Sequence, residues 1–122
     1  PPAERVRLEG PVREMVACYA AADAFILPTR YDPFSNACLE ALQAGLPVIT
    51  TRENGFSEII TPGRDGEVVS DPADAGALAR AIEAWADPVR RREARPRLQA
   101  LAAGYTVEEN VRAALQRLLA SA

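Results

Sequence analysis

The sequence predicts an α/β fold, with a Rossmann-like parallel sheet flanked by helices. Short continuous apolar runs, at Phe25–Leu27 and Pro47–Thr51, alternate with segments of helical periodicity. Such runs are typical of strands buried on both faces of a parallel sheet, and repeated βα units produce that kind of sheet. The 122 residues contain no internal repeat and no low-complexity linker. We therefore expect residues 1–122 to form a single domain.

The first part of the chain predicts a strand, a helix and a second strand. Val6–Leu8 alternates like a short strand and ends at the Gly10-Pro11 turn. An amphipathic helix should follow, because apolar residues recur at intervals of three and four positions: Val12, Met15, Val16, Tyr19 and Ala22. Phe25–Leu27 is then expected to be a strand buried on both faces, and Pro28 ends it.

The middle of the chain continues the alternation. A helix is expected from Ser35 to Ala44, and Gly45 stops it. After the strand at Pro47–Thr51 and a turn at Asn54-Gly55, residues 56–60 predict a short helix. Residues 67–69 predict the last strand, since turn signals come directly before it.

Three helices are expected to complete the chain. Asp71 or Asp74 caps the first, and Pro88 begins the second. Pro96 should kink or break the second helix, because proline lacks an N–H and clashes with the preceding turn. Thr106 and Glu109 predict a capping box for the third. The apolar stripe of the first helix consists of Leu78, Ile82 and Trp85. The apolar stripe of the third consists of Val107, Val111, Leu115 and Leu118. Core packing of the tryptophan is favoured over stacking on a sugar.

The composition excludes several kinds of chemistry. The chain has no lysine and no histidine, so all 14 basic residues are arginine. A histidine base or metal ligand, a Schiff-base lysine and a Walker-type lysine are therefore excluded from this segment. Cys18 and Cys38 show no metal-ligand spacing, which favours packed thiols over a disulfide or a nucleophile.

Charge and hydropathy indicate where the protein resides and which partners it does not bind. No apolar run reaches membrane-spanning length, and the start of the chain has no signal-peptide pattern, so we expect a cytoplasmic protein. The net charge of −3 argues against a nucleic-acid partner. The chain begins without an initiator methionine, which is typical of a part of a longer protein.

The stretch from Tyr31 to Leu42 joins two acids to a helix start. If Ser35 is the N-cap, the amides that follow lack intrahelical partners and can hold a phosphate. Glu40, further along the helix, can accept hydrogen bonds from a ribose diol, and Asp32 can contact a sugar hydroxyl. Spacing alone favours a structural interpretation as much as this functional one. In the structural interpretation Ser35 only caps the helix, Glu40 is solvated and Asp32 forms a turn.

This stretch resembles the C-terminal nucleotide-sugar-binding domain of family-4 glycosyltransferases, which have the two-domain GT-B fold. The resemblance covers nearly the whole chain. It depends on ordered motifs at Arg7–Gly10, Tyr19–Thr29, Asp32 to Glu40, Gly45–Val48, Asn54–Ile59 and Asp65-Gly66.

The resemblance implies a role for each candidate site residue. Glu40 would bind the ribose, and Asp32 would contact donor-sugar hydroxyls as the candidate catalytic residue. The family usually has Glu at the first acid, so Asp32 is one methylene shorter, and its sugar contact is altered or made through water. The sugar and diphosphate would be held by the backbone amides of Phe34, Ser35, Asn36 and Ala37. The nucleobase would be bordered by residues 8–12, which include Leu8, Gly10 and Pro11.

The reaction implied by the resemblance is retaining transfer of a hexose from a nucleotide-diphosphate sugar to an acceptor hydroxyl, without a cofactor or an essential metal. Tyr31–Asn36 is similar to bacterial enzymes of lipopolysaccharide-core assembly, which suggests UDP-glucose as donor and a glycan or lipid-linked glycan as acceptor. The chain lacks the family's N-terminal acceptor domain and its Arg and Lys pair for the diphosphate. We therefore expect it to be inactive alone.

Alternatives remain for the function and for the arginines. The alternative function is a non-catalytic nucleotide-sugar-binding module. A receiver domain would need a lysine and a nicotinamide-binding half would need a GxGxxG motif, and this sequence contains neither. A basic cluster can meet anionic lipid as a peripheral contact of the parent, although a solvated face is favoured: Arg90, Arg91, Arg92, Arg95 and Arg97. Arg30 and Arg52 follow strand ends, and a surface role is favoured over a phosphate contact for each.

Overall fold

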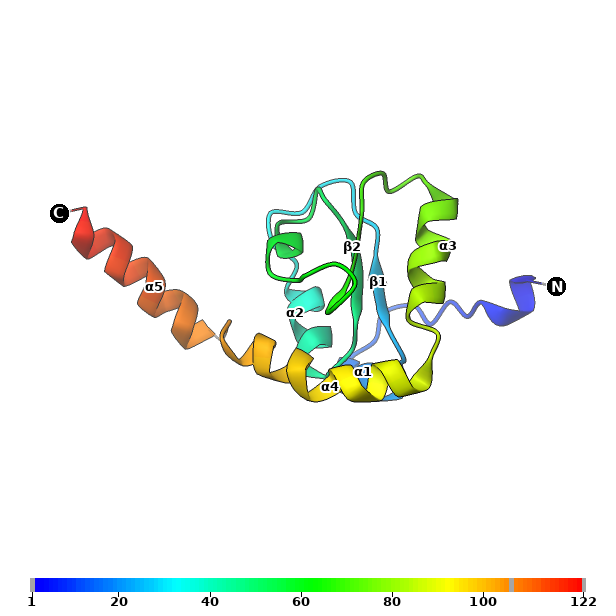
Figure 1. The fold of residues 1–122 in the computed structure, drawn as a ribbon. Helices are drawn as coiled ribbons and strands as arrows, with labels where there is room; N and C mark the ends of the chain where they lie inside the picture. The colour runs from blue at the N-terminus through cyan, green and yellow to red at the C-terminus, as the bar shows by residue number, and fades with distance from the viewer. Residues whose placement is uncertain (1, 106, 122) are drawn as a thin grey trace.

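The computed structural model describes residues 2–105 and 107–121, which form a small sheet surrounded by helices (Figure 1). Along the chain the elements are η1 (Pro2–Arg5), α1 (Met15–Ala21), β1 (Phe25–Leu27), α2 (Asn36–Gln43), β2 (Val48–Thr51), η2 (Gly55–Glu58), β3 (Gly66–Val69), α3 (Ala75–Ala84), α4 (Pro88–Ala103) and α5 (Val107–Ala120). Helices and strands alternate from α1 to α3, as the sequence predicts.

The three strands form one parallel sheet in the order β1-β2-β3. Phe25 of β1 lies opposite Val48 of β2, which in turn lies opposite Gly66 of β3. The predicted α/β fold class is therefore confirmed. Because the strands are parallel, their carboxyl ends meet at one edge of the sheet, where ligands of such folds bind. The turn between β1 and α2, which carries Asp32, begins at this edge.

The prediction that Phe25–Leu27 is buried on both faces is wrong. β1 is an edge strand, in which Ile26 is 39% exposed and its two neighbours are half-buried. Helix α3 packs on β2 and β3, so Ile26 lies beyond its cover. All four residues of the central strand β2 are buried. A continuous apolar run therefore identified a strand but not its position in the sheet.

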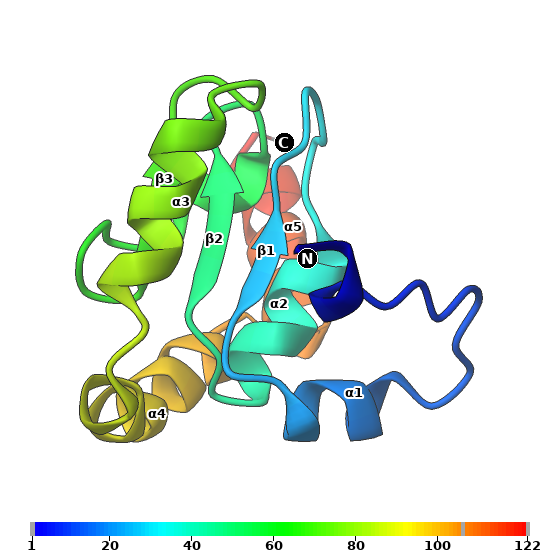
Figure 2. The same cartoon turned by 90° about the vertical axis from the view of Figure 1, so that its right-hand side faces the viewer.

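Helices cover the two faces of the sheet, with α2 on one side and α3 on the other (Figure 2). The larger core cluster lies on the side of α2 and α4, and its largest side chains include Leu42, Phe56, Trp85 and Leu98. The smaller cluster joins Ile49 and other residues of the sheet to α3. This packing makes α2, the helix of the candidate site, part of the main core.

Trp85 lies in the core, as predicted. Its side chain is 2% exposed, and its Nε1 donates to Glu67 Oε1 at 3.1 Å. The guanidinium of Arg90 covers the ring at 3.9 Å from its centroid. No open ring face is left for a sugar. Ile82, expected on the same stripe, is 46% exposed, whereas Leu78 packs against the smaller cluster.

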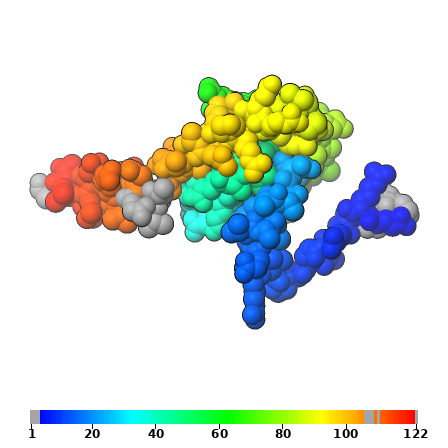
Figure 3. All heavy atoms as spheres, turned by 90° about the horizontal axis from the view of Figure 1, so that it is seen from below, coloured from blue at the N-terminus to red at the C-terminus, as the bar shows by residue number. Residues whose placement is uncertain are grey.

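The predicted strand at Val6–Leu8 is wrong. Residues 6–14 contain no helix or strand, and they extend away from the body (Figure 3). Leu8 is 96% exposed. The three-stranded sheet places no strand beside this segment, so its alternating pattern has no surface on which to be buried. The predicted first helix begins only at Met15.

The helices after the sheet begin largely where the sequence predicts. Asp74 caps α3 by accepting from the Ala77 amide at 2.9 Å, and Pro88 stands at the start of α4. Pro96, which is predicted to kink or break this helix, does not break it, because α4 continues through Pro96. Pro96 is exposed, so water can solvate the carbonyl that its missing N–H leaves free. Thr106, of the predicted capping box, lies outside the described residues.

Three of the five clustered arginines attach α4 to the body. Arg90 donates to the Gly63 carbonyl at 2.5 Å, and Arg91 donates to the Trp85 carbonyl at 2.8 Å. Arg97 pairs with Asp65 at 3.5 Å. The cluster is therefore neither wholly solvated nor wholly free to meet lipid. In the part of the chain that the structure describes, no helix is long and apolar enough to cross a membrane.

Candidate functional site

The turn from Asp32 to Ser35 ends in a capped helix start. Ser35 has extended backbone angles, φ −89° and ψ 112°, and is the N-cap of α2, as predicted. Its Oγ accepts from the Cys38 amide at 3.1 Å, and its side chain is buried. The cap fixes the entry of the chain into α2, because it satisfies one amide that the helix itself cannot.

Asp32 orders the turn with its own carboxylate. The Asp32 Oδ1 accepts from the Phe34 amide at 3.0 Å. The predicted ligand contact of the Phe34 amide therefore has a competitor within the protein. The second carboxylate oxygen of Asp32 has no partner among the described residues, and the residue is half-buried.

Three consecutive amides at the start of α2 have no acceptor within the described part of the chain. They belong to Ser35, Asn36 and Ala37. These amides lie at the positive end of the helix dipole, where an anion is stabilised. The amides available to an anion are therefore those of three of the four residues predicted to hold the sugar and diphosphate.

Glu40 lies on the exposed face of α2, whereas Leu42 is buried. Its Oε2 accepts from the hydroxyl of Tyr19 in α1 at 3.1 Å. The same hydroxyl lies 3.4 Å from the carbonyl oxygen of Ala37. Burial, together with the hydrogen bond to Glu40, raises the pKa of Tyr19 to about 12, so the phenol remains a donor at neutral pH. The contact joins residues 21 positions apart, and no local pattern predicts it.

A groove of about 550 Å³ lies beside Glu40, between α1 and α2. It is lined by Arg13, Glu14, Met15, Val16, Tyr19, Glu40, Gln43 and Ala44. Leu8, Gly10 and Pro11, which are predicted to border a nucleobase, do not line it, because their segment extends away from the body (Figure 3). The structure therefore brings together the turn and α2, but not the N-terminal part of the predicted site.

The turn is pinned to the segment that follows β2. The Asp32 amide donates to the Glu53 carbonyl at 3.2 Å, and the Gly55 amide donates to the Asp32 carbonyl at 2.9 Å. A Cβ on Gly55 would lie 1.9 Å from the Pro33 carbonyl oxygen, so only glycine fits there. The sequence predicts a turn at Asn54-Gly55, but the contact of this turn with the Asp32 turn is long-range, and no local pattern predicts it.

Asn54 supports this contact from inside the protein. It is fully buried, its Nδ2 donates to Thr50 Oγ1 at 3.0 Å, and its Oδ1 accepts from the Phe56 amide at 3.0 Å. The same Nδ2 lies 3.5 Å from the Sγ of Cys38. Burial raises the pKa of the Cys38 thiol, which is typical of a packed cysteine and not of a nucleophile.

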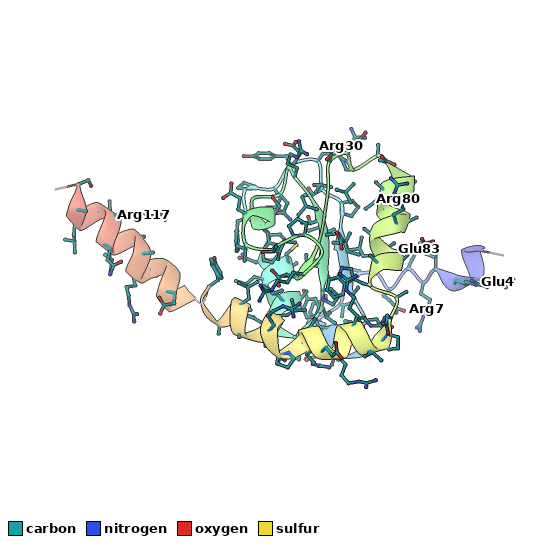
Figure 4. All side chains as sticks on the ribbon, viewed as in Figure 1. Glu4, Arg7, Arg30, Arg80, Glu83 and Arg117 are labelled. Atoms are coloured by element: carbon teal, nitrogen blue, oxygen red, sulfur yellow. The ribbon has the colours of Figure 1, made fainter. Side chains whose placement is uncertain are left out.

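Two arginines lie near the same edge of the sheet as the turn. Arg52 donates to Ser70 Oγ at 2.9 Å. Arg30 lies above the carboxyl ends of the strands, at the top of the body (Figure 4). No group of three or more Cys, Asp and Glu side chains in the described residues is placed to hold a metal ion.

Comparison with known proteins gives the family of this chain. The family model described as "Glycosyl transferases group 1" matches residues 2–87. Glycogen synthase from Mycobacterium tuberculosis is 34% identical over 110 residues, which cover 88% of this chain and 26% of that protein. The lipopolysaccharide core biosynthesis mannosyltransferase LpsB from Rhizobium meliloti is 31% identical over 121 residues, covering 91% of this chain and 32% of its own length.

A solved structure agrees with these matches. Sucrose-phosphate synthase from Thermosynechococcus elongatus superposes with a TM-score of 0.71 and 30% identity, over 98% of this chain and 31% of that one. The chain thus spans about a quarter to a third of the length of these relatives. The expected resemblance, including its GT-B fold, is confirmed, and the chain belongs to the group 1 glycosyl transferases.

Proposed function

We propose that this chain is the nucleotide-sugar-binding part of a retaining glycosyltransferase, which transfers a hexose from a nucleotide-diphosphate sugar to an acceptor hydroxyl. The observation that supports it most is the order of groups along α2: the free amides of Ser35, Asn36 and Ala37 come first, and the Glu40 carboxylate follows. Asn36 and Glu40 are about 6 Å apart along a helix axis. A diphosphate on the amides and a ribose at Glu40 would follow the same order as in a nucleotide.

The charges along α2 favour this assignment. A diphosphate gains from the free amides and the helix dipole, and these fixed dipoles would also stabilise the charge that develops on it as the leaving group. A carboxylate beside a diphosphate would repel it, so Glu40 suits a neutral diol better than a phosphate. The nucleoside would then occupy the groove between α1 and α2.

Asp32 is proposed to contact the donor sugar. Its Oδ1 is engaged by the Phe34 amide, which leaves Oδ2 for a sugar hydroxyl. Asp32 remains our candidate catalytic residue on this basis. Leu8, Gly10 and Pro11 would meet the nucleobase only after their segment folds towards α2.

The parent protein is proposed to carry a separate acceptor domain, with residues 1–122 as one domain that binds the donor. The relatives include a glycogen synthase and a lipopolysaccharide core mannosyltransferase, which supports a parent acting in polysaccharide or lipopolysaccharide synthesis. UDP-glucose is our proposed donor, and a glycan or lipid-linked glycan the acceptor. We place the reaction in the cytoplasm, at the inner face of the membrane.

Titration of the ¹⁵N-labelled chain with UDP, GDP and ADP tests the site. We expect amide shifts at Ser35, Asn36 and Ala37, and an affinity at least about tenfold lower for Glu40→Ala, because hydrogen bonds to charged groups are worth that much. Glu83→Ala is the matched control, since Glu83 is exposed on α3, across the sheet from α2 (Figure 4). Shifts confined to other regions, or equal affinity for both variants, would overturn the proposal.

A further inference from the structure

One side chain of α1 contacts the carboxylate on which the proposed ribose site depends. The Tyr19 hydroxyl donates to Glu40 Oε2 at 3.1 Å, with the Ala37 carbonyl oxygen as a second acceptor at 3.4 Å. Both acceptors belong to α2, and Glu40 is itself exposed. This hydrogen bond is the one described contact that fixes the direction of the Glu40 carboxylate.

The Tyr19 hydroxyl is held in place by the protein core. Its side chain is 6% exposed, and its ring meets Phe25 of β1 edge to face, with centroids 5.8 Å apart. The other residues of α1 remain largely on the surface, since Tyr19 is its one buried residue. The position of the hydroxyl is therefore set by β1, from beneath the groove that α1 and α2 line.

We propose that Tyr19 is a positioning residue for Glu40, an inference that rests on the proposed ribose contact. The phenol occupies Oε2 and leaves Oε1 to accept from the ribose diol. An exposed glutamate samples several rotamers, and a ligand that orders it must offset the lost freedom. Tyr19 orders the carboxylate before the nucleotide arrives, which raises affinity without touching the ligand.

The variant Tyr19→Phe removes the hydroxyl and keeps the ring against Phe25. We expect the affinity for whichever of UDP, GDP and ADP binds most tightly to fall about three- to tenfold, as one lost hydrogen bond allows. Tyr105→Phe is the matched control, because Tyr105 follows α4 and does not line the groove. Its affinity should equal that of the unmodified chain.

Two further measurements separate positioning from a general structural effect. The first uses the 2′,3′-dideoxy form of the same nucleotide, which lacks the diol. Tyr19→Phe should weaken the complete nucleotide and leave the dideoxy form unchanged. The second is a double-mutant cycle, in which Tyr19→Phe should have no further effect once Glu40 is alanine, since coupled residues are not additive.

The outcomes distinguish the two proposals. An unmodified chain that binds none of the three nucleotides, or binds complete and dideoxy forms equally, would overturn the proposed function together with the role of Tyr19. A diol preference that Glu40→Ala removes and Tyr19→Phe leaves intact would overturn the role of Tyr19 alone. Equal losses for both nucleotide forms in Tyr19→Phe would also overturn it, because they indicate altered folding.

Discussion

The turn before α2 and the Glu40 carboxylate within α2 are supported in different ways. The turn before α2 is joined to the segment after β2 by hydrogen bonds from the Asp32 amide to Glu53 and from the Gly55 amide to Asp32. The Glu40 carboxylate, one turn into the helix, is held by a single hydrogen bond from Tyr19. The phosphate side of the proposed site therefore depends on backbone, and the ribose side depends on one side chain.

Burial also differs between the turn before α2 and the α1 side of the groove. Asn54, behind the turn, is fully buried and hydrogen-bonded at both ends of its amide. On the other side, Met15 and Val16 of α1 are 37% and 78% exposed. Phe34 in the turn packs against the main core, whereas α1 is attached largely through Tyr19.

This difference matches what each half of a nucleotide would need. A diphosphate is stabilised best by dipoles that are already fixed before it binds, because reorganising them would cost part of the gain. A diol needs only one correctly directed carboxylate. Three variants test this difference in support, and they should differ in the size of their effects.

Gly55→Ala should have the largest effect. Its Cβ would lie 1.9 Å from the Pro33 carbonyl oxygen, so the turn must move away from the segment after β2. We expect the free energy of unfolding to fall by about 3 to 4 kcal/mol, the range of severe overpacking. Urea unfolding measures this change.

Gly76→Ala is the control for that substitution. Gly76 lies in α3, where the added Cβ would meet nothing closer than 3.3 Å, and alanine favours a helix. It should leave stability unchanged or raise it by about 0.5 to 1 kcal/mol. If Gly55→Ala were as stable as this control, close contact with the segment after β2 would not hold the turn in place.

Local signals explain what the sequence predicted well. Ser35 and Asp74 cap their helices through bonds to amides three residues away, and Gly45 ends α2 with a φ of 84°. Such signals act between near neighbours, so one short segment contains all of the information. The apolar run at Phe25–Leu27 likewise identified a strand correctly.

Long-range packing explains what the sequence could not show. The exposure of Ile26 depends on where α3 lies, and the failure of the strand at Val6–Leu8 depends on which strands form the sheet. The contacts of Tyr19 with Glu40 and of Gly55 with Asp32 join segments about twenty residues apart. The resemblance assigned Glu40 and Asp32, but the residues that hold them are defined only by the fold.

Alkaline pH should destabilise the folded chain through Tyr19, which contacts the ribose side of the proposed site. The pKa of Tyr19 is raised from 10.0 to about 12 in the folded chain, so folding favours the protonated phenol. This stability is fully present below the unfolded pKa and is lost as pH rises through the folded pKa. Linkage predicts that this contribution to the unfolding free energy is lost as pH rises from about 10 to about 12.

Comparison with Tyr19→Phe isolates this loss. The variant cannot ionise at position 19, so the difference in unfolding free energy between the two proteins should shrink as pH rises. The two proteins share every other side chain, so the difference between them reports on the hydroxyl at position 19. A difference that stays constant across this pH range would mean that the phenol is not held as a donor to Glu40.

Ser35→Ala should have the smallest effect and should stay local. It removes the cap from the Cys38 amide, which typically costs about 1 kcal/mol. Native-state hydrogen exchange should quicken at Cys38, because that amide loses its acceptor. The Phe34 amide should keep its protection, since Asp32 still accepts from it and the backbone bonds to Glu53 and Gly55 remain.

Ser57→Ala is the control, as its hydroxyl has no hydrogen-bond partner among the described residues. If exchange quickened at Phe34 and Cys38 together, the turn would depend on the helix cap and not on the backbone contacts behind it. The turn would then depend on a single side chain, as the Glu40 carboxylate does.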